Sequence, residues 1–315
     1  MGNASASDTP LTFDDRSGCP LCGSSASTVY RAFQEIPVLR CTGCQFLYSG
    51  RIMPAGQLAS YYQKDFGSDR HRKGQIVNAA TNVRVLASVM DLAKAKRWLD
   101  VGTGYGFLLA ALRDRFSVEA SGVELSESEA AFARENLALN VTSSLNDSSI
   151  AKRSFDVVSC FEVIEHIALP VSFLQGLMEY VRPGGYLIIM TDNFESAPVN
   201  KLAGGFPKWI PHTHISHFSA QTLRKCIGQC GGLRLEKEYS YTPPDLIGRC
   251  MLSSFRKPPL DEDAFDLRAT LQTEMNRGYR FFGFRNWLNP LWARLTGSRS
   301  AERGELMYMV CRVLP

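Results

Sequence analysis

The chain has 315 residues, of which 45% are hydrophobic and 21% charged, and its formal net charge is +4 at pH 7. These values are ordinary for a globular protein and exclude a disordered chain, a collagen or a long coiled coil. No apolar run approaches the roughly 18 residues that a membrane-spanning helix needs. The N-terminal residues also lack the pattern of a secretory signal. We therefore expect an intracellular, cytoplasmic protein whose nine cysteines are reduced thiols or metal ligands.

Two pairs of cysteines follow a small, polar N-terminal stretch (1–17) that we expect to be a mobile tail. Cys19 and Cys22 form one C-x2-C pair, and Cys41 and Cys44 form the other. Their separation is typical of a zinc ribbon, in which each pair aims two thiolates at one tetrahedral ion. Residues 18–50 therefore indicate a module that holds a structural Zn²⁺. Redox thiols, an iron site and unrelated thiols are the alternatives.

Apolar periodicity predicts the organisation of the remaining chain. A helical connector (51–96) precedes strand-like runs that alternate with amphipathic stretches. The expected strands lie near 98–102, 117–124, 155–161, 186–191 and 233–239, and the expected helices at 107–115, 127–137, 171–181 and 220–229. This alternation predicts an α/β fold: a Rossmann-like, doubly wound, mostly parallel sheet with helices on both faces. Residues 241–304 read as a helical insertion or lid, and residues 305–315 as the final strand of the core sheet.

A glycine-rich turn follows the first strand of this core. Asp100 begins the pattern D-x-G-x-G-x-G, whose Gly102, Gly104 and Gly106 let the backbone turn tightly and approach a ligand closely. The spacing differs from the G-x-G-x-x-G of dinucleotide-binding folds, and the acid suits a cationic ligand. Glu124 ends the next strand, where a carboxylate can accept hydrogen bonds from ribose hydroxyls.

The chain resembles class I S-adenosylmethionine (SAM)-dependent methyltransferases over about 97–240. The resemblance is carried by the segments LDVGTGYG, GVE, FDVVSCFEVIEH, VRPGGYLIIMTDN and HISHFSAQTLRKCIGQCGG. It implies that the glycine turn cradles the methionine part of SAM and that Glu124 holds the ribose. Ser144 stands where the family often has an acid or amide for the adenine. The expected SAM-binding residues are Asp100, Gly102, Thr103, Gly104, Gly106, Glu124, Leu125, Asp147 and Phe161.

Acidic and histidine residues follow a later apolar strand, at the sheet edge where ligands bind in such folds. Glu162, Glu165 and His166 would share one face if the chain coils there, and His214 and His217 come further along. Three roles are open for these residues. They could form a hydrogen-bond network, supply a general base that removes a proton from a substrate hydroxyl, or bind Mg²⁺ or Mn²⁺. The third arrangement resembles ubiquinone-pathway O-methyltransferases and small-RNA 2′-O-methyltransferases. We predict catalytic roles for Glu165, His166 and His217.

The late insertion contains an arginine-rich and aromatic stretch. Residues 277–303 carry six arginines and one acid, interleaved with Phe, Tyr and Trp. Such a stretch fits a helix packed on the core, a lid over an acceptor pocket, a membrane-surface helix or a nucleic-acid contact.

The head of the chain resembles that of a group of zinc-headed methyltransferases. The cysteine pairs are followed by Phe46, Tyr48, Pro54 and the pair Tyr61 and Tyr62. Together the patterns predict a SAM-dependent methyltransferase that acts on a small-molecule or sugar-bearing acceptor, at a hydroxyl. The alternatives are an RNA methyltransferase, which would use the zinc module and the arginine-rich stretch, and a non-catalytic SAM-binding module.

Overall fold

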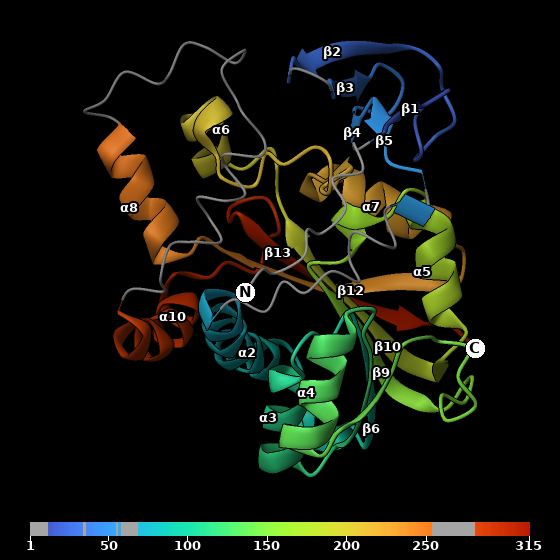
Figure 1. Cartoon of the computed structure of the whole chain (residues 1–315), viewed down its shortest axis with the longest axis vertical. Coiled ribbons are helices and arrows are strands. Elements are labelled where there is room, and N and C mark those ends of the chain that lie inside the picture. The colour runs from blue at the N-terminus through green and yellow to red at the C-terminus, as the bar shows by residue number, and fades with distance from the viewer. Residues whose placement is uncertain (1–11, 34–35, 55, 58–68, 254–280) are drawn as a thin grey trace, which may run out of the picture.

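A computed structural model describes residues 12–33, 36–54, 56–57, 69–253 and 281–315 (Figure 1). Most of the expected N-terminal tail lies outside these residues, as do Tyr61, Tyr62, Arg277 and Arg280. Among the described helices, none combines the length and the apolar character needed to cross a membrane.

A seven-stranded sheet forms the centre of the described chain, in the order β12-β13-β10-β9-β6-β7-β8. The strands from β10 to β8 pair in parallel, whereas β13 runs antiparallel to both β10 and β12. The predicted Rossmann-like α/β fold is thus confirmed. The strands are β6 (Arg97–Val101), β7 (Glu119–Val123), β8 (Asn140–Thr142), β9 (Phe155–Phe161), β10 (Val181–Asp192), β12 (Leu233–Tyr241) and β13 (Leu306–Val313).

Two strands begin at other residues than predicted, for local reasons. Strand β7 begins at Glu119 and not at 117, because Ser117 adopts a left-handed φ of 55° as it ends helix α3 (Phe107–Phe116). Strand β10 begins before 186, since residues 182–185 form an irregularity within the strand, where its register against β9 shifts.

Alternate residues of the central strands face two separate cores. On β10, Leu187 and Ile189 pack into one apolar cluster, and Ile188 and Met190 pack into the other. Such apolar strands, buried on both faces, are what a mostly parallel sheet requires. One face is covered by α5 (Pro170–Met178) and α7 (Ala220–Gln229), and the other by α2 (Asp69–Val89), α3, α4 (Glu127–Leu137) and α10 (Phe282–Thr296) (Figure 1).

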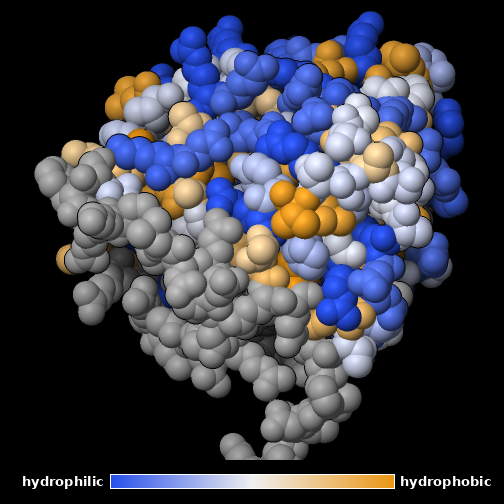
Figure 2. Space-filling model, turned by 90° about the horizontal axis from the view of Figure 1, so that it is seen from above, coloured by the Kyte–Doolittle hydropathy of each residue, from blue (hydrophilic) through white to orange (hydrophobic). Residues whose placement is uncertain are grey.

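The four-cysteine region lies on a second sheet, in the order β11-β4-β3-β2. Its strands are β2 (Ser27–Arg31), β3 (Val38–Cys41), β4 (Leu47–Ser49) and β11 (Ser216–His217), and β1 (Asp14–Asp15) pairs with β5 (Arg51–Ile52) beside it. Strand β11 belongs to residues 212–217, which contain three histidines and which we call the histidine segment. It pairs with β4 in the antiparallel direction, although it lies far along the chain. Seen from the side of this sheet, hydrophobic residues form small patches among hydrophilic ones (Figure 2).

The described part of the late insertion packs on the core. Helix α10 lies along α2 (Figure 1), and Nε1 of Trp292 donates a hydrogen bond of 3.0 Å to the carbonyl of Thr242. Phe281, Phe284 and Trp287, at the start of α10 and in its first two turns, are more than half exposed. The remaining short elements are η1 (Leu92–Lys94), η2 (Ile164–His166), α6 (Ala197–Leu202), η3 (Ala203–Gly205) and α8 (Pro244–Ser253).

Trp209 joins the N-terminal region to the core, and we expect its removal to destabilise the fold. Its ring centroid lies 6.1 Å from those of Tyr30 and Phe33 and 4.8 Å from that of Phe194. Trp209→Ala should lower the free energy of unfolding by about 3–5 kcal/mol, as measured by urea denaturation, because it leaves a large cavity. Trp287→Ala, at an exposed position on α10, should change it by less than about 0.5 kcal/mol. Equal effects of the two substitutions would contradict this role.

Candidate active site

The glycine turn between β6 and α3 adopts the backbone that its glycines predict. Gly102, Gly104 and Gly106 have φ angles of 76°, 56° and 79°, in the left-handed region that favours glycine. A Cβ on Gly104 would lie 2.6 Å from Nε2 of Gln75, and a Cβ on Gly102 would collide with Val163. These glycines therefore let Val163 and Gln75 pack directly against the turn, which lies at the carboxyl edge of the sheet, where ligands bind in folds of this type.

Asp100 is buried beneath this turn. Its Oδ1 accepts a hydrogen bond of 2.5 Å from Oγ of Ser159, which in turn accepts one of 2.8 Å from Nε1 of Trp98. Burial raises the pKa of Asp100 from its usual 3.8 to about 7. The carboxyl group is thus held in one orientation, and a cationic ligand beside it would favour its ionised form.

Glu124 follows β7 and binds the same turn. Its Oε2 accepts the N–H of Gly104 at 2.8 Å, and its Oε1 accepts the N–H of Ser126 at 2.8 Å. These bonds fix the carboxylate beside the glycine turn. A carboxylate offers about four lone-pair sites, so it can still accept hydrogen bonds from a ribose.

Helix α2 makes a contribution that we did not predict from the sequence. Oε1 of Gln75 accepts the N–H of Tyr105 at 2.9 Å, and its Nε2 donates to Oε2 of Glu129 at 3.1 Å. The other oxygen of the buried Glu129 lies 3.0 Å from Nε2 of His71. The helix therefore closes against the glycine turn. The helical spacing of His71 and Gln75 was a signal for a shared face, but it did not indicate what that face contacts.

Four other predicted SAM-binding residues lie at different depths. Thr103 is buried within the turn, Phe161 ends β9, and Leu125 is 52% exposed. Asp147 is exposed, and its Oδ1 accepts hydrogen bonds from the N–H and the hydroxyl of Ser149. Asp147 thus has partners within its own turn, and a contact with adenine stays a prediction.

Glu165, His166 and His214 come together from two separate segments, and we call them the acid–histidine group. One ligand atom from each lies within 4.8 Å of the others. The short helix η2 carries Glu165 and His166 just beyond the end of β9. The N–H of Ile215 donates a hydrogen bond of 2.8 Å to the carbonyl of Glu165, which holds the histidine segment in place.

Each member of the acid–histidine group offers an atom suited to a metal ion. Oε2 of Glu165 accepts from the hydroxyl of Thr191 at 2.8 Å, and its buried Oε1 has no hydrogen-bond partner among the described residues. Nδ1 of His166 lies 2.9 Å from the carbonyl of Thr213 and so donates there, which leaves Nε2 as the basic nitrogen. Burial lowers the pKa of His166 to about 4, so the ring is neutral, the form that binds metals. Within the described chain, Nδ1 of His214 also has no hydrogen-bond partner.

The structure does not bring two other predicted residues into this group. The ring of His217 enters an aromatic cluster, 4.6 Å from that of Phe194 and 5.1 Å from that of Trp209, because its backbone pairs with β4. Glu162 does not share a face with Glu165, because its φ of 55° interrupts the chain before η2. Its side chain pairs with Lys208 instead, at 2.9 Å.

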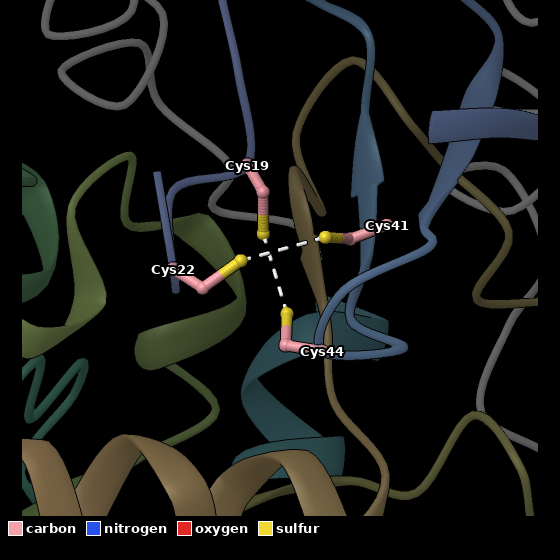
Figure 3. A group of neighbouring side chains, drawn as sticks. All are labelled: Cys19, Cys22, Cys41 and Cys44. Atoms are coloured by element: carbon pink, nitrogen blue, oxygen red, sulfur yellow. Dashed lines mark hydrogen bonds between the residues drawn. The ribbon is translucent and has the colours of Figure 1, made fainter. Parts of the chain in front are cut away.

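The four cysteine thiols converge on one point (Figure 3). The sulfur atoms of Cys19 and Cys44 are 3.5 Å apart, as are those of Cys22 and Cys41. Thiolates bound to Zn²⁺ at about 2.3 Å in a tetrahedron would lie about 3.8 Å from one another. The arrangement therefore fits a tetrahedral ion with four protein ligands.

The sequence is similar to known methyltransferases. A family of methyltransferase domains matches residues 70–236. The ubiquinone biosynthesis O-methyltransferase of Neisseria meningitidis serogroup C is 31% identical over 108 residues, which cover 32% of this chain and 45% of the relative. The enzyme of the same name from Coxiella burnetii is 33% identical over 106 residues, with 32% and 45% covered. The matched segment thus spans less than half the length of these curated relatives.

Solved structures share the fold. A SAM-dependent methyltransferase from Thermotoga maritima superposes with a TM-score of 0.50 at 15% identity, covering 77% of this chain and 94% of its own. A chain from the complex between the Haloferax volcanii Trm112 methyltransferase activator and a methyltransferase also has a TM-score of 0.50, at 18% identity, covering 82% and 98%. At these identities the similarity concerns the fold alone.

The raised pKa of Asp100 predicts how stability depends on pH. The folded chain keeps this proton up to about pH 7, whereas the unfolded chain releases it near 3.8. The stability that Asp100 contributes is therefore present below pH 3.8 and is lost as the pH rises to about 7. Because Asp100→Asn does not titrate, its free energy of unfolding relative to the parent chain should rise across this window by on the order of 3 kcal/mol.

Urea denaturation of both chains without SAM, at several pH values, measures this difference. Asp114→Asn, at an exposed position on α3, is the matched substitution measured beside it. A difference for Asp100→Asn that stays constant with pH would contradict the raised pKa.

Proposed function

The chain belongs to the methyltransferase-domain family, and on that premise we propose that it transfers a methyl group from SAM to a hydroxyl of a small-molecule or sugar-bearing acceptor. The convergence of Glu165, His166 and His214 at the sheet edge that carries the glycine turn is the main support. The similarity to ubiquinone biosynthesis O-methyltransferases over a third of the chain supports an oxygen acceptor. The resemblance to methyltransferases that the sequence motifs indicated is confirmed.

The glycine turn, Asp100 and Glu124 form the SAM site in this proposal. SAM supplies a methyl group that its sulfonium already activates, so the protein has to align it with the acceptor and exclude water. The carboxylate of Asp100 suits the positively charged amino-acid end of the cofactor. Glu124 accepts hydrogen bonds from the ribose hydroxyls, beside the glycine turn to which its hydrogen bond with Gly104 holds it.

The acid–histidine group holds a divalent ion, Mg²⁺ or Mn²⁺, in this proposal. Such an ion would lower the pKa of the acceptor hydroxyl and so assist its deprotonation. Oε1 of Glu165 and the basic nitrogens of His166 and His214 are the ligands. The hydroxyl of Thr191 and the carbonyl of Thr213 orient two of them through the hydrogen bonds described above.

The four cysteines hold a structural Zn²⁺ in the same proposal. Four thiolates complete a tetrahedral coordination, which leaves no position for a substrate. The ion stabilises the sheet whose strand β4 pairs with β11, next to His214. Its role is therefore to support the histidine segment and not to take part in methyl transfer.

Glu124→Gln should weaken SAM binding, because an amide cannot accept the same set of hydrogen bonds as a carboxylate. We expect a rise in Kd of about tenfold or more, or roughly 1.4 kcal/mol, in calorimetric titrations with SAM. Glu119→Gln is the matched control, since Glu119 lies exposed at the opposite end of the same strand, β7. An unchanged Kd for Glu124→Gln would remove Glu124 from the SAM site.

The proposed reaction is tested by labelled methyl transfer from SAM into a small-molecule extract. Transfer should fall when the zinc-loaded chain is stripped of loosely bound divalent ions, and should return with Mn²⁺. Glu165→Gln should lower the rate by about 10–100-fold without changing SAM affinity, because it removes a metal ligand. Glu135→Gln, exposed on α4, is the control.

Three outcomes would contradict parts of this proposal. Full transfer by the stripped chain would exclude the divalent ion. Label found only in the RNA of an unfractionated extract would favour the RNA alternative. SAM binding without methyl transfer into small molecules or RNA would favour a non-catalytic SAM-binding module.

A further inference from the structure

A second group of charges adjoins the acid–histidine group and is not used in the proposed reaction. Nζ of Lys208 lies 2.9 Å from Oε1 of Glu162, 2.5 Å from Oδ1 of Asp192 and 3.6 Å from Oε1 of Glu305. Glu162 directly follows β9, Asp192 ends β10 and Glu305 directly precedes β13, and these strand ends meet at one edge of the sheet. We call these four residues the Lys208 cluster.

The Lys208 cluster has a buried floor and an accessible rim. The side chains of Asp192 and Glu305 are 0% and 3% exposed, whereas those of Lys208 and Glu162 are 29% and 34% exposed. Buried carboxylates repel one another and lose their hydration, so a positive charge close by stabilises them. Although burial opposes it, the charges of Asp192 and Glu162 hold the pKa of Lys208 well above 10.5, and the side chain is an ammonium.

Unused atoms in the cluster indicate that it is built around a cation. Oδ2 of Asp192 is buried without a hydrogen-bond partner among the described residues, 3.9 Å from Nδ1 of His214. Burial raises the pKa of Glu305 well above 4.5, so this carboxyl keeps its proton and shares a hydrogen bond with Asp192. Several carboxylate oxygens around one point are the ligand set that hard divalent ions prefer. The cluster therefore has the donors of a metal site, with an ammonium at its centre.

The backbone of Glu162 is held in a conformation that fits this assignment. Its φ of 55° lies in the left-handed region, which is strained for a residue with a side chain. The side chain is fixed by Lys208 on Oε1 and by Nδ2 of Asn78 on Oε2, at 3.3 Å. Both oxygens of Glu162 thus have partners outside the acid–histidine group.

We propose that Lys208 is a resident cation, whose ammonium takes the place of a second divalent ion among Glu162, Asp192 and Glu305. It thereby keeps Glu162 out of the acid–histidine group, which is left with three protein ligands. Lys208 is a positioning residue in this assignment, since it acts on the acceptor site through Glu162. The role of Lys208 as a resident cation depends on the Lys208 cluster alone. The exclusion of Glu162 from the acid–histidine group rests on the proposed function.

Counting bound Mn²⁺ on the full-length, zinc-loaded chain tests this proposal, with the electron paramagnetic resonance signal of free Mn²⁺ as the readout. Lys208→Gln removes the charge and keeps a hydrogen-bond donor, whereas Lys208→Arg keeps the charge. The parent chain should bind one Mn²⁺ in the acid–histidine group, and Lys208→Gln should bind one more. Lys208→Arg should bind the same number as the parent chain.

The result separates this proposal from the proposed function. If the parent chain binds no Mn²⁺ and Lys208→Gln binds one, the metal in the acid–histidine group is excluded and the resident cation is supported. A folded Lys208→Gln chain that binds no more Mn²⁺ than the parent would overturn the proposal. Should Lys208→Gln not fold, Mn²⁺ should restore its native circular dichroism, and failure to do so would overturn it equally.

A substitution of Glu162 gives a second, independent measurement. If Lys208 keeps Glu162 out of the acid–histidine group, Glu162→Gln should change the Mn²⁺ affinity of the parent site by less than about twofold, since removing even a group that only supports a metal ligand costs about 10–100-fold. A tenfold loss would make Glu162 a metal ligand and would overturn the second part of the proposal.

Discussion

The backbone of Ile215 connects the two sheets of this molecule. Its N–H donates to the carbonyl of Glu165 at 2.8 Å, and its carbonyl accepts the N–H of Ser49 at 3.0 Å. The hydroxyl of Ser49 adds a bond of 2.7 Å to the carbonyl of Pro211. Because buried backbone groups must be paired, the segment cannot move without breaking bonds on both sides. The position of His214 beside Glu165 therefore depends on the sheet that lies beside the four cysteines.

Three buried acidic side chains at the edge of the central sheet, near the ends of β9, β10 and β13, lower the stability of the folded chain. Glu165, Asp192 and Glu305 are all buried, where ionised carboxylates lose their hydration. Alternating apolar residues on β9, β10 and β13 fill both cores beneath them and provide the opposing stabilisation. Such local conflict between burial and charge is typical of functional sites.

The sequence was sufficient where local spacing determines structure. The glycine turn, the carboxylate of Glu124 after its strand and the convergence of the cysteine pairs all follow from short patterns, and the structure has them where predicted. The alternation of apolar runs likewise predicted the order of the core strands and helices, except for the three-residue strand β8.

The sequence was insufficient where segments far apart along the chain meet. Spacing alone could not predict which of His214 and His217 faces Glu165. The two-residue strand β11 pairs with β4, and this pairing directs His217 away from Glu165. Lys208 and Gln75 stand in no recognisable motif, and their partners come from other elements. The left-handed backbone of Glu162 has no local signal either, since only glycine, asparagine or aspartate commonly marks that conformation.

Strand β11 has a consequence for the order in which the chain is made. The cysteine pairs and strands β2 to β4 leave the ribosome before the central sheet, and they can form hairpins at once because their contacts are local. The fourth strand of their sheet is synthesised only after most of the central sheet has emerged. Until β11 is synthesised, strand β4 therefore forms an unpaired edge of this sheet. It also cannot be exchanged between relatives as a self-contained cassette, because part of its sheet is encoded with the histidine segment.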